Sequence, residues 1–280
     1  MNLEKTVIEI GLEKPLKILH VTDTHLALCD NRDDERKQAL ARRRAVSHEN
    51  VERDLKEQIA YAETNCDLLV HTGDLMDFIS KANVEKSRII LQNEKILYIA
   101  GNHDYSQYMG EAWEDMTYRM NSYMSLGEGG LGVNMFFTSR IVGGVNFVGV
   151  DNAYHQVEEW QTERLRYEVQ KGYPVILCMH APLFEQALYE RSIDEFKDGS
   201  AYVMGCDEEH LMTYPEFRAC EQRPTEATKK FVAYVNSESR IKAVLAGHLH
   251  FNFASMLSGG AMQYVTGGGY RNIAREITIL

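Results

Sequence analysis

Short apolar runs alternate with longer amphipathic stretches along much of the chain. A continuous apolar run of four to eight residues is typical of a buried strand, whereas apolar residues three and four positions apart predict a helix. The runs predict buried strands over residues 16–21, 68–70, 95–100, 174–180 and 241–246. Helical spacing predicts helices over residues 46–64, 81–91, 111–124, 161–170 and 225–236. Strands and helices in alternation are typical of parallel crossover units in an α/β fold.

Shorter apolar segments between glycine turns predict a second sheet. These strands are expected over residues 133–137, 140–142 and 145–150. Alternation over residues 7–10 predicts an edge strand, and residues 256–261 and 262–265 predict a hairpin around Gly259 and Gly260. Residues 273–280 are expected to form a closing strand.

Two stretches depart from this pattern. Residues 30–44 are dense in charge, which is typical of a solvated loop or helix face. Residues 183–223 are rich in Tyr, Asp, Glu and Met and show no regular period, so we expect an irregular, substrate-recognising segment there. The chain has 280 residues, of which 44% are hydrophobic. We therefore expect one domain over residues 1–280, with a large core.

Charge and cysteine content narrow the classes of function. The formal net charge of -11 argues against binding nucleic acid mainly by neutralising phosphates. Arg42, Arg43 and Arg44 form a local basic run, which is more often a solvated helix face than a phosphate site. The five cysteines show no CxxC spacing and predict neither a disulfide framework nor a zinc ribbon. With no signal-peptide pattern and no membrane-length apolar stretch, a cytoplasmic location is expected.

Potential metal ligands follow the ends of the predicted strands. The carboxyl ends of strands are where α/β sheets collect ligands. Mixed imidazole and carboxylate donors suit Mn, Fe and Zn, whereas Mg and Ca prefer oxygen alone. The candidate segments are Asp23-Thr24-His25, Gly73-Asp74, Gly101-Asn102-His103-Asp104, His180, and Gly247-His248-Leu249-His250. Two ions about 3.5–4 Å apart, bridged by a carboxylate and a hydroxide, are suited to in-line displacement at phosphorus.

The remaining histidines are interpreted as structural, because an isolated His is more often a hydrogen-bonded core or surface residue than a ligand. They are His20, His48, His71, His155 and His210. His155 follows a strand end, and His210 lies in the irregular segment, so contact of either with substrate stays open.

The five segments, in this order, resemble the calcineurin-like metallophosphoesterases, whose pattern is DxH, GDxxD, GNHD or GNHE, a lone His, and GHxH. The resemblance runs from Asp23 to His250 and implies a fold of two mixed sheets packed as a sandwich and flanked by helices. It also implies two divalent ions, Mn, Fe or Zn, with Mn and Fe favoured. The implied ligands are Asp23, His25 and His250 for the first ion, Asn102, His180 and His248 for the second, and Asp74 as the bridge.

The resemblance further implies that His103 acts on the phosphate rather than on a metal. It would stabilise the transition state or protonate the leaving oxygen. Asp77 would orient His103 and keep it cationic. The implied reaction is hydrolysis of a phosphate ester by a hydroxide that bridges the metals.

Departures from relatives within the superfamily narrow the activity. Phe78-Ile79 and Asp104 stand where protein Ser/Thr phosphatases carry Arg-Gly and Glu, and Asp77 stands where purple acid phosphatases carry a metal-binding Tyr. A small phosphodiester or nucleotide is the favoured substrate, with a nuclease of the same superfamily as one alternative. The other is a metal-free scaffold in a protein complex. The sequence leaves metal identity, monoester or diester preference and oligomeric state open.

Overall fold

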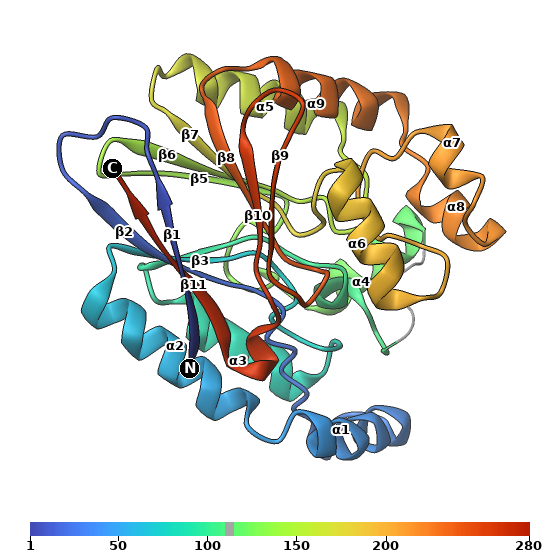
Figure 1. The fold of residues 1–280 in the computed structure, drawn as a ribbon. Coiled ribbons are helices and arrows are strands. Elements are labelled where there is room, and N and C mark those ends of the chain that lie inside the picture. The colour runs from blue at the N-terminus through green and yellow to red at the C-terminus, as the bar shows by residue number, and fades with distance from the viewer. Residues whose placement is uncertain (110–114) are drawn as a thin grey trace.

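Two mixed β-sheets pack face to face in the computed structural model, which describes residues 1–109 and 115–280 (Figure 1). Within these residues, one sheet has the strand order β1-β11-β2-β3-β4 and the other the order β5-β6-β7-β8-β10-β9. This confirms the predicted α/β sandwich. The strands are β1 (Asn2–Ile8), β2 (Leu16–Val21), β3 (Leu68–His71), β4 (Ile96–Tyr98), β5 (Phe137–Val142), β6 (Val145–Val150), β7 (Val175–Cys178), β8 (Ile241–Ala246), β9 (Phe253–Met256), β10 (Met262–Val265) and β11 (Ile273–Ile279).

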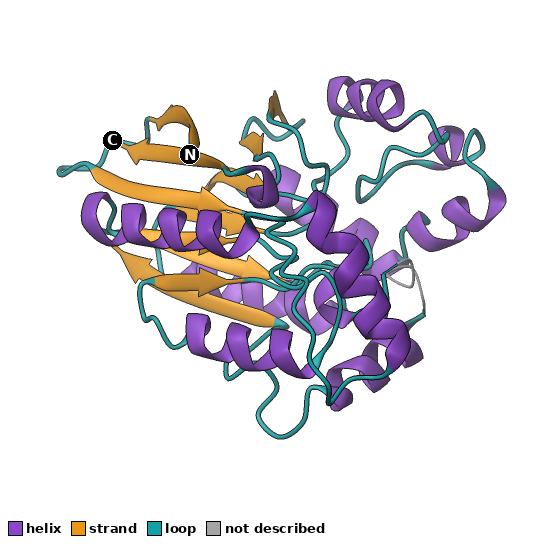
Figure 2. Cartoon of the chain, turned by 90° about the horizontal axis from the view of Figure 1, so that it is seen from below, coloured by secondary structure: helices purple, strands orange, loops and turns teal. Residues whose placement is uncertain are grey.

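Helices cover the outer faces of both sheets, with α2 and α3 on one and α5 and α9 on the other (Figure 1). Seen from below, the strands lie toward one end of the molecule, and loops and further helices occupy the other (Figure 2). No helix within the described residues is long and apolar enough to cross a membrane. The helices are α1 (Glu35–Ser47), α2 (Val51–Asn65), α3 (Lys81–Leu91), η1 (His103–Tyr105), α4 (Met116–Ser125), α5 (Glu159–Gln170), α6 (Gln186–Phe196), α7 (Glu208–Leu211), α8 (Glu216–Gln222), α9 (Glu226–Ser237) and η2 (Gly269–Arg271).

The central strands are buried on both faces, which explains their continuous apolar sequences. Successive side chains of β3 point to opposite sides of its sheet. Leu68 and Val70 therefore enter the core between the two sheets, whereas Leu69 packs toward the α2 and α3 layer. In the other sheet, Ile176 faces the inter-sheet core and Leu177 faces α5 and α9. The layers fix the strand ends from which the candidate ligands project.

Several element boundaries differ from the prediction. The edge strand is β1 at residues 2–8 rather than 7–10, because one of its faces meets solvent and its charged residues hid the pattern. Residues 133–136 lie outside the strands, and 137–142 are one strand, in which Ser139 and Ile141 are exposed. The hairpin's first strand is β9, residues 253–256, so residues 257–261 are its turn.

The helices also differ in two places. The charged stretch folds as α1, and α2 begins only at Val51, so the predicted helix over 46–64 is divided near His48. The segment 183–223, expected to be irregular, carries α6, α7 and α8. Of the helix predicted over 111–124, residues 116–124 lie in α4, and residues 111–114 lie outside the described residues.

A buried ion pair attaches α4 to the sandwich. Arg119 on α4 pairs with Asp151, which follows β6, and both side chains are at most 5% exposed. Asp151 also accepts a hydrogen bond from the Tyr105 hydroxyl at 2.7 Å. The Arg119 guanidinium lies 4.6 Å from the centre of the Tyr105 ring. Since Tyr105 ends η1, which begins at His103, this pair links α4 to the segment that carries a candidate catalytic residue.

We expect Arg119→Met to lower the free energy of unfolding by about 3–5 kcal/mol, because the buried Asp151 carboxylate loses its counter-charge. Urea denaturation measures the change. The matched control is Arg32→Met, which breaks ion pairs with the largely exposed Asp30 and Glu85. That control should cost much less stability, because ion pairs in contact with solvent contribute little. Equal losses of stability in the two variants would show that the Arg119–Asp151 pair contributes no more than an exposed ion pair.

Candidate metal centre

The strand-end segments converge at one edge of the sandwich, and backbone hydrogen bonds join their loops. The Asp23 N–H donates to the Gly73 carbonyl at 2.9 Å, and the His25 N–H donates to the Asp74 carbonyl at 2.9 Å. On the neighbouring sheet, the Gly247 N–H donates to the His180 carbonyl at 2.9 Å. The loops after β2, β3, β7 and β8 therefore hold their side chains in fixed relative positions.

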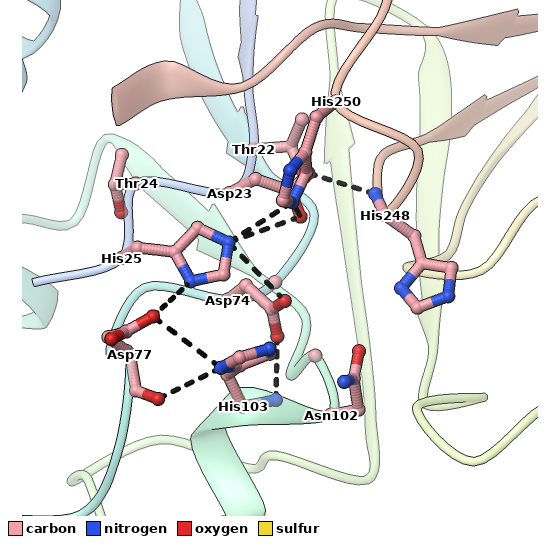
Figure 3. Close-up of polar contacts among 12 residues, drawn as sticks. Thr22, Asp23, Thr24, His25, Asp74, Asp77, Asn102, His103, His248 and His250 are labelled. Atoms are coloured by element: carbon pink, nitrogen blue, oxygen red, sulfur yellow. Dashed lines mark hydrogen bonds and ion pairs between the residues drawn. The ribbon is translucent and has the colours of Figure 1, made fainter. Parts of the chain in front are cut away.

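A first cluster brings together Asp23, His25, Asp74 and His250, with one donor atom of each within 4.8 Å of the others (Figure 3). The His250 Nε2 atom lies 3.1 Å from Asp23 Oδ1 and 3.2 Å from His25 Nε2. His25 Nε2 is also 3.7 Å from Asp74 Oδ2. Two carboxylates and two imidazoles thus face a common point.

A second cluster brings together Asp74, His180 and His248. The His180 Nε2 atom lies 3.4 Å from Asp74 Oδ2, 3.1 Å from His248 Nδ1 and 2.9 Å from the Asn102 amide oxygen. Asp74 is common to both clusters, and the same oxygen, Oδ2, faces a nitrogen in each. The carboxylate predicted as a bridge therefore lies between the two groups.

The orientation of the imidazoles fits divalent metal ions. His25 Nδ1 donates to the Asp77 carboxylate at 3.0 Å, and His180 Nδ1 donates to the Thr72 carbonyl at 2.7 Å. Because each ring uses Nδ1 as its donor, the neutral form presents a lone pair at Nε2. These lone pairs point at carboxylate oxygens, an amide oxygen and other imidazoles. Lone pairs that face one another repel when no ion is between them, and they are stabilised when they surround a cation.

The protein further stabilises the two central carboxylates. Asp23 Oδ2 accepts from the Thr22 hydroxyl at 2.7 Å and from the His248 N–H at 2.8 Å. Asp74 Oδ1 accepts from the His103 N–H at 2.8 Å. Burial alone would raise the pKa of Asp74, but the neighbouring imidazoles hold it well below its ordinary value. Burial likewise opposes a charged His180, yet the Asp74 carboxylate raises the pKa of His180 to about 10.

Five of the clustered residues have a left-handed backbone, which non-glycine residues seldom adopt. Their φ angles lie between 50° and 69°, and the residues are Asp23, His25, Asp74, His248 and His250. Each such residue costs of order 1–3 kcal/mol, and such strain concentrates at functional sites. Gly73, with φ of 98°, allows the close approach of the loops, since a Cβ there would lie 2.6 Å from both Gly101 N and His180 Nδ1.

His103 lies beside the first cluster, but its orientation comes from an unexpected atom. Its Nδ1 donates to the Asp77 backbone carbonyl at 2.8 Å. The Asp77 carboxylate, expected to orient His103, is instead hydrogen-bonded to His25 and lies 3.6 Å from His103 Nδ1 (Figure 3). Burial would lower the pKa of His103, but the Asp74 and Asp77 carboxylates raise it above its ordinary value.

The sequence did not reveal the supporting roles of two residues, Arg44 and Asp104. Arg44 of α1 binds the Asp77 carboxylate through two nitrogens, at 2.7 and 2.8 Å. Only the basic run marked this position, and nothing in it singles out Arg44. Asp104 accepts from the N–H groups of Gly101 at 2.8 Å and Met76 at 2.9 Å, joining two ligand loops. Burial, aided by Asp74, raises the pKa of Asp104 to about 6. Its place in the Gly-Asn-His-Asp motif was a usable signal.

The histidines interpreted as structural have different surroundings. His20 and His71 are buried and bonded to threonine hydroxyls, and burial lowers their pKa values to about 3 and about 4. His210 hydrogen-bonds within α7 and to α6. His48 stacks on the Tyr270 ring at 4.7 Å, beside the first cluster. His155 packs against the His248 ring at 5.1 Å, beside the second.

A cavity of about 880 Å³ opens onto both clusters. Metal-cluster residues and His103 form one wall, and side chains from the segment 183–223 form much of the other. Its lining residues are Asp74, Asn102, His103, Asp115, Met116, Tyr154, His155, Gln156, Phe196, Tyr202, Phe217, Arg218, Cys220, Glu221, Arg223, Thr225, His248 and His250. The site can therefore hold a ligand much larger than a phosphate ion beside the clustered donors.

Solved structures with similar chain traces include three proteins of low sequence identity. A dimetal phosphatase from Danio rerio has 12% identity and a TM-score of 0.49, with 91% of this chain and 88% of that chain covered. A putative 5'-nucleotidase from Staphylococcus aureus has 12% identity and a TM-score of 0.44, with 91% and 49% covered. The phosphopantetheinyl hydrolase of Mycobacterium tuberculosis has 14% identity and a TM-score of 0.40, with 91% and 90% covered.

These TM-scores lie below 0.5, so membership of a family is judged from a sequence model of that family instead. No curated protein sequence matches the chain significantly. The model described as calcineurin-like phosphoesterase matches residues 16–252, which include every strand-end segment described above. The chain therefore belongs to the calcineurin-like phosphoesterase family and is a metal-dependent phosphoric ester hydrolase.

Proposed function

We propose that the protein hydrolyses a small phosphodiester or nucleotide with the help of two divalent metal ions, Mn or Fe in preference to Zn. The observation that carries this proposal is the position of Asp74, whose Oδ2 atom faces His25 in one cluster and His180 in the other. A shared carboxylate between two imidazole-rich groups is the arrangement that a pair of ions requires. The net charge of -11 supports a small substrate over DNA.

In this proposal the six clustered side chains and Asn102 are the metal ligands. Asp23, His25 and His250 hold one ion, Asn102, His180 and His248 hold the other, and Asp74 bridges them. When bound, the ions supply Lewis acidity that lowers the pKa of water and polarises the phosphoryl oxygens for in-line attack. Asn102 contributes an amide oxygen, so the second group has less negative charge than the first.

His103 is proposed to act on the phosphate. Its Nδ1–H donates to the Asp77 carbonyl, so a proton for the substrate must come from Nε2, which carries one only in the imidazolium form. The raised pKa of His103 favours the imidazolium, which can stabilise charge on the phosphoryl oxygens or protonate the leaving oxygen. Asp77 has a positioning role, since its carboxylate fixes His25 and its carbonyl fixes His103.

We expect His103→Ala to lower kcat for a generic aryl phosphodiester by about 10²–10⁴-fold in Mn, while the metal content stays that of the unmodified protein. Asp74→Asn should abolish turnover and also lose metal, because the bridging charge is removed. Steady-state kinetics and elemental analysis separate the two effects. Full activity in metal-loaded His103→Ala would remove the proposed role of His103.

Adding Mn to metal-stripped protein should raise its resistance to unfolding. The clustered metal ligands come together only in the folded state. Free Mn at about 100 times its dissociation constant should therefore raise the free energy of unfolding by about 2.7 kcal/mol. Thermal denaturation with and without Mn measures the shift, and Asp74→Asn should show much less of it. Well under one metal per chain after supply of Mn or Fe, with no shift, would favour the scaffold alternative.

Arg44→Met should weaken Mn affinity by about 10–100-fold, because Asp77 loses the guanidinium that fixes it against His25. Arg43→Met is the matched control, since Arg43 lies in the same basic run and is exposed. Competition with a metal-binding dye gives both affinities. Equal affinities in the two variants would show that Arg44 does not position the ligand.

A further inference from the structure

The cavity extends well beyond the metal clusters, so its far wall has a ligand to recognise. Its volume of about 880 Å³ lies within the roughly 300–1,000 Å³ range of small-molecule sites, and a phosphate group fills only a small part of it. Several far-wall residues come from α6, α8 and the chain between them. Figure 1 shows these helices gathered on the side of the molecule where β7 and β8 end.

Three aromatic side chains, Phe196, Tyr202 and Phe217, lie in this wall. The Arg218 guanidinium carbon lies 4.9 Å from the ring centres of both Tyr202 and Phe217. The Phe196 ring meets Tyr202 edge-on at 5.1 Å, and Tyr202 in turn lies 6.0 Å from the His248 ring. Rings held by such contacts give flat, rigid surfaces. Phe217 is nonetheless 57% exposed, which is unusual for a large aromatic side chain that lines a cavity.

The charges of the wall do not favour an anion. Arg218 is paired with Glu221 at 3.0 Å, and Arg223 is paired with Glu208 at 2.8 Å. Because each arginine has a carboxylate partner, the positive potential beyond the metal clusters is largely cancelled. A neutral group therefore suits this wall better than a second phosphate or the backbone of a nucleic acid.

Backbone strain links this wall to the metal clusters. Tyr202 and His155 have φ angles of 55° and 57°, the same left-handed conformation as five clustered residues. His155 packs against His248 at 5.1 Å and lines the cavity. Residues with a strained backbone thus occur both among the candidate metal ligands and in the far wall of the cavity. This is expected where one ligand contacts both regions.

We propose that Tyr202, Phe217 and Arg218 form a specificity wall that stacks against a neutral planar aromatic group on the alcohol side of the ester. The substrates are then phosphate esters of alcohols that carry a planar aromatic group, of which nucleosides are the main biological class. A planar ring suits rigid rings and a guanidinium plane better than a flexible chain, which loses more conformational entropy. This substrate class rests on the proposed phosphoesterase function.

The test compares esters that share a phosphate and a primary alcohol but differ in the aromatic group. In Mn-loaded protein, kcat/KM for adenosine 5'-monophosphate should exceed that for ribose 5-phosphate by at least about tenfold, and their methyl diesters should show the same order. Phe217→Ala should lower the adenosine values by about tenfold and leave the ribose values unchanged. Tyr167→Ala, which removes an equally exposed aromatic outside the cavity, should change neither.

Calorimetric binding of adenosine to the Mn-loaded protein tests the wall without turnover. An affinity for adenosine that falls about tenfold in Phe217→Ala, and not in Tyr167→Ala, supports the specificity wall. If no ester is hydrolysed in that case, the proposed phosphoesterase function is wrong but the specificity wall is not. Turnover of an aryl phosphodiester with no preference for the adenosine esters overturns the wall and leaves the proposed function standing. An equal loss for adenosine and ribose esters in Phe217→Ala also overturns it.

Discussion

The structure depends on keeping ionised carboxylates inside the protein. Asp23, Asp74 and Asp77 are at most 1% exposed, and moving one such group out of water costs several kcal/mol. Hydrogen bonds from backbone N–H groups compensate part of this cost at Asp23 and Asp74, and Arg44 compensates it at Asp77. The imidazoles supply the rest only if they are protonated or share a cation. Since His25 and His180 present a lone pair to the centre when neutral, metal binding lets these imidazoles and the carboxylates be satisfied together.

The same constraint explains the local backbone. A side chain that leaves a strand in its ordinary extended conformation continues to alternate between the faces of the sheet. The left-handed conformations of Asp23, His25, His248 and His250 break that alternation immediately after β2 and β8. The chain turns sharply there, so that Asp23 and His25 reach the same cluster, whereas His248 and His250 reach different ones. Hydrogen bonds between the loops, and the buried strands that the loops follow, offset the free-energy cost of the strained backbone.

Much of this was predictable because the relevant signals are local. The apolar runs of β3 and β8 are buried on both faces, and the polar motifs after them follow a fixed order, so both strands and clustered residues were found. Arg44 could not be found, because its contact with Asp77 depends on where α1 lies rather than on its neighbours in sequence. The exposed face of β1 obscured its alternation of apolar and polar residues. The helices α6–α8 are short and pack on one another, so their apolar residues do not recur at a clear helical spacing.

Leu249 connects the helices that carry the proposed specificity wall to the loop that carries two candidate metal ligands. Leu249 is 1% exposed and packs with residues of α6, α7 and α8, together with Ala246 at the end of β8. It stands between His248 and His250, whose rings enter separate clusters. The core of the helical segment is therefore anchored on the same three-residue loop that supplies both histidines. A shift of the aromatic wall would move Leu249, and with it the two candidate ligands, so the wall and the clustered donors keep one relative geometry.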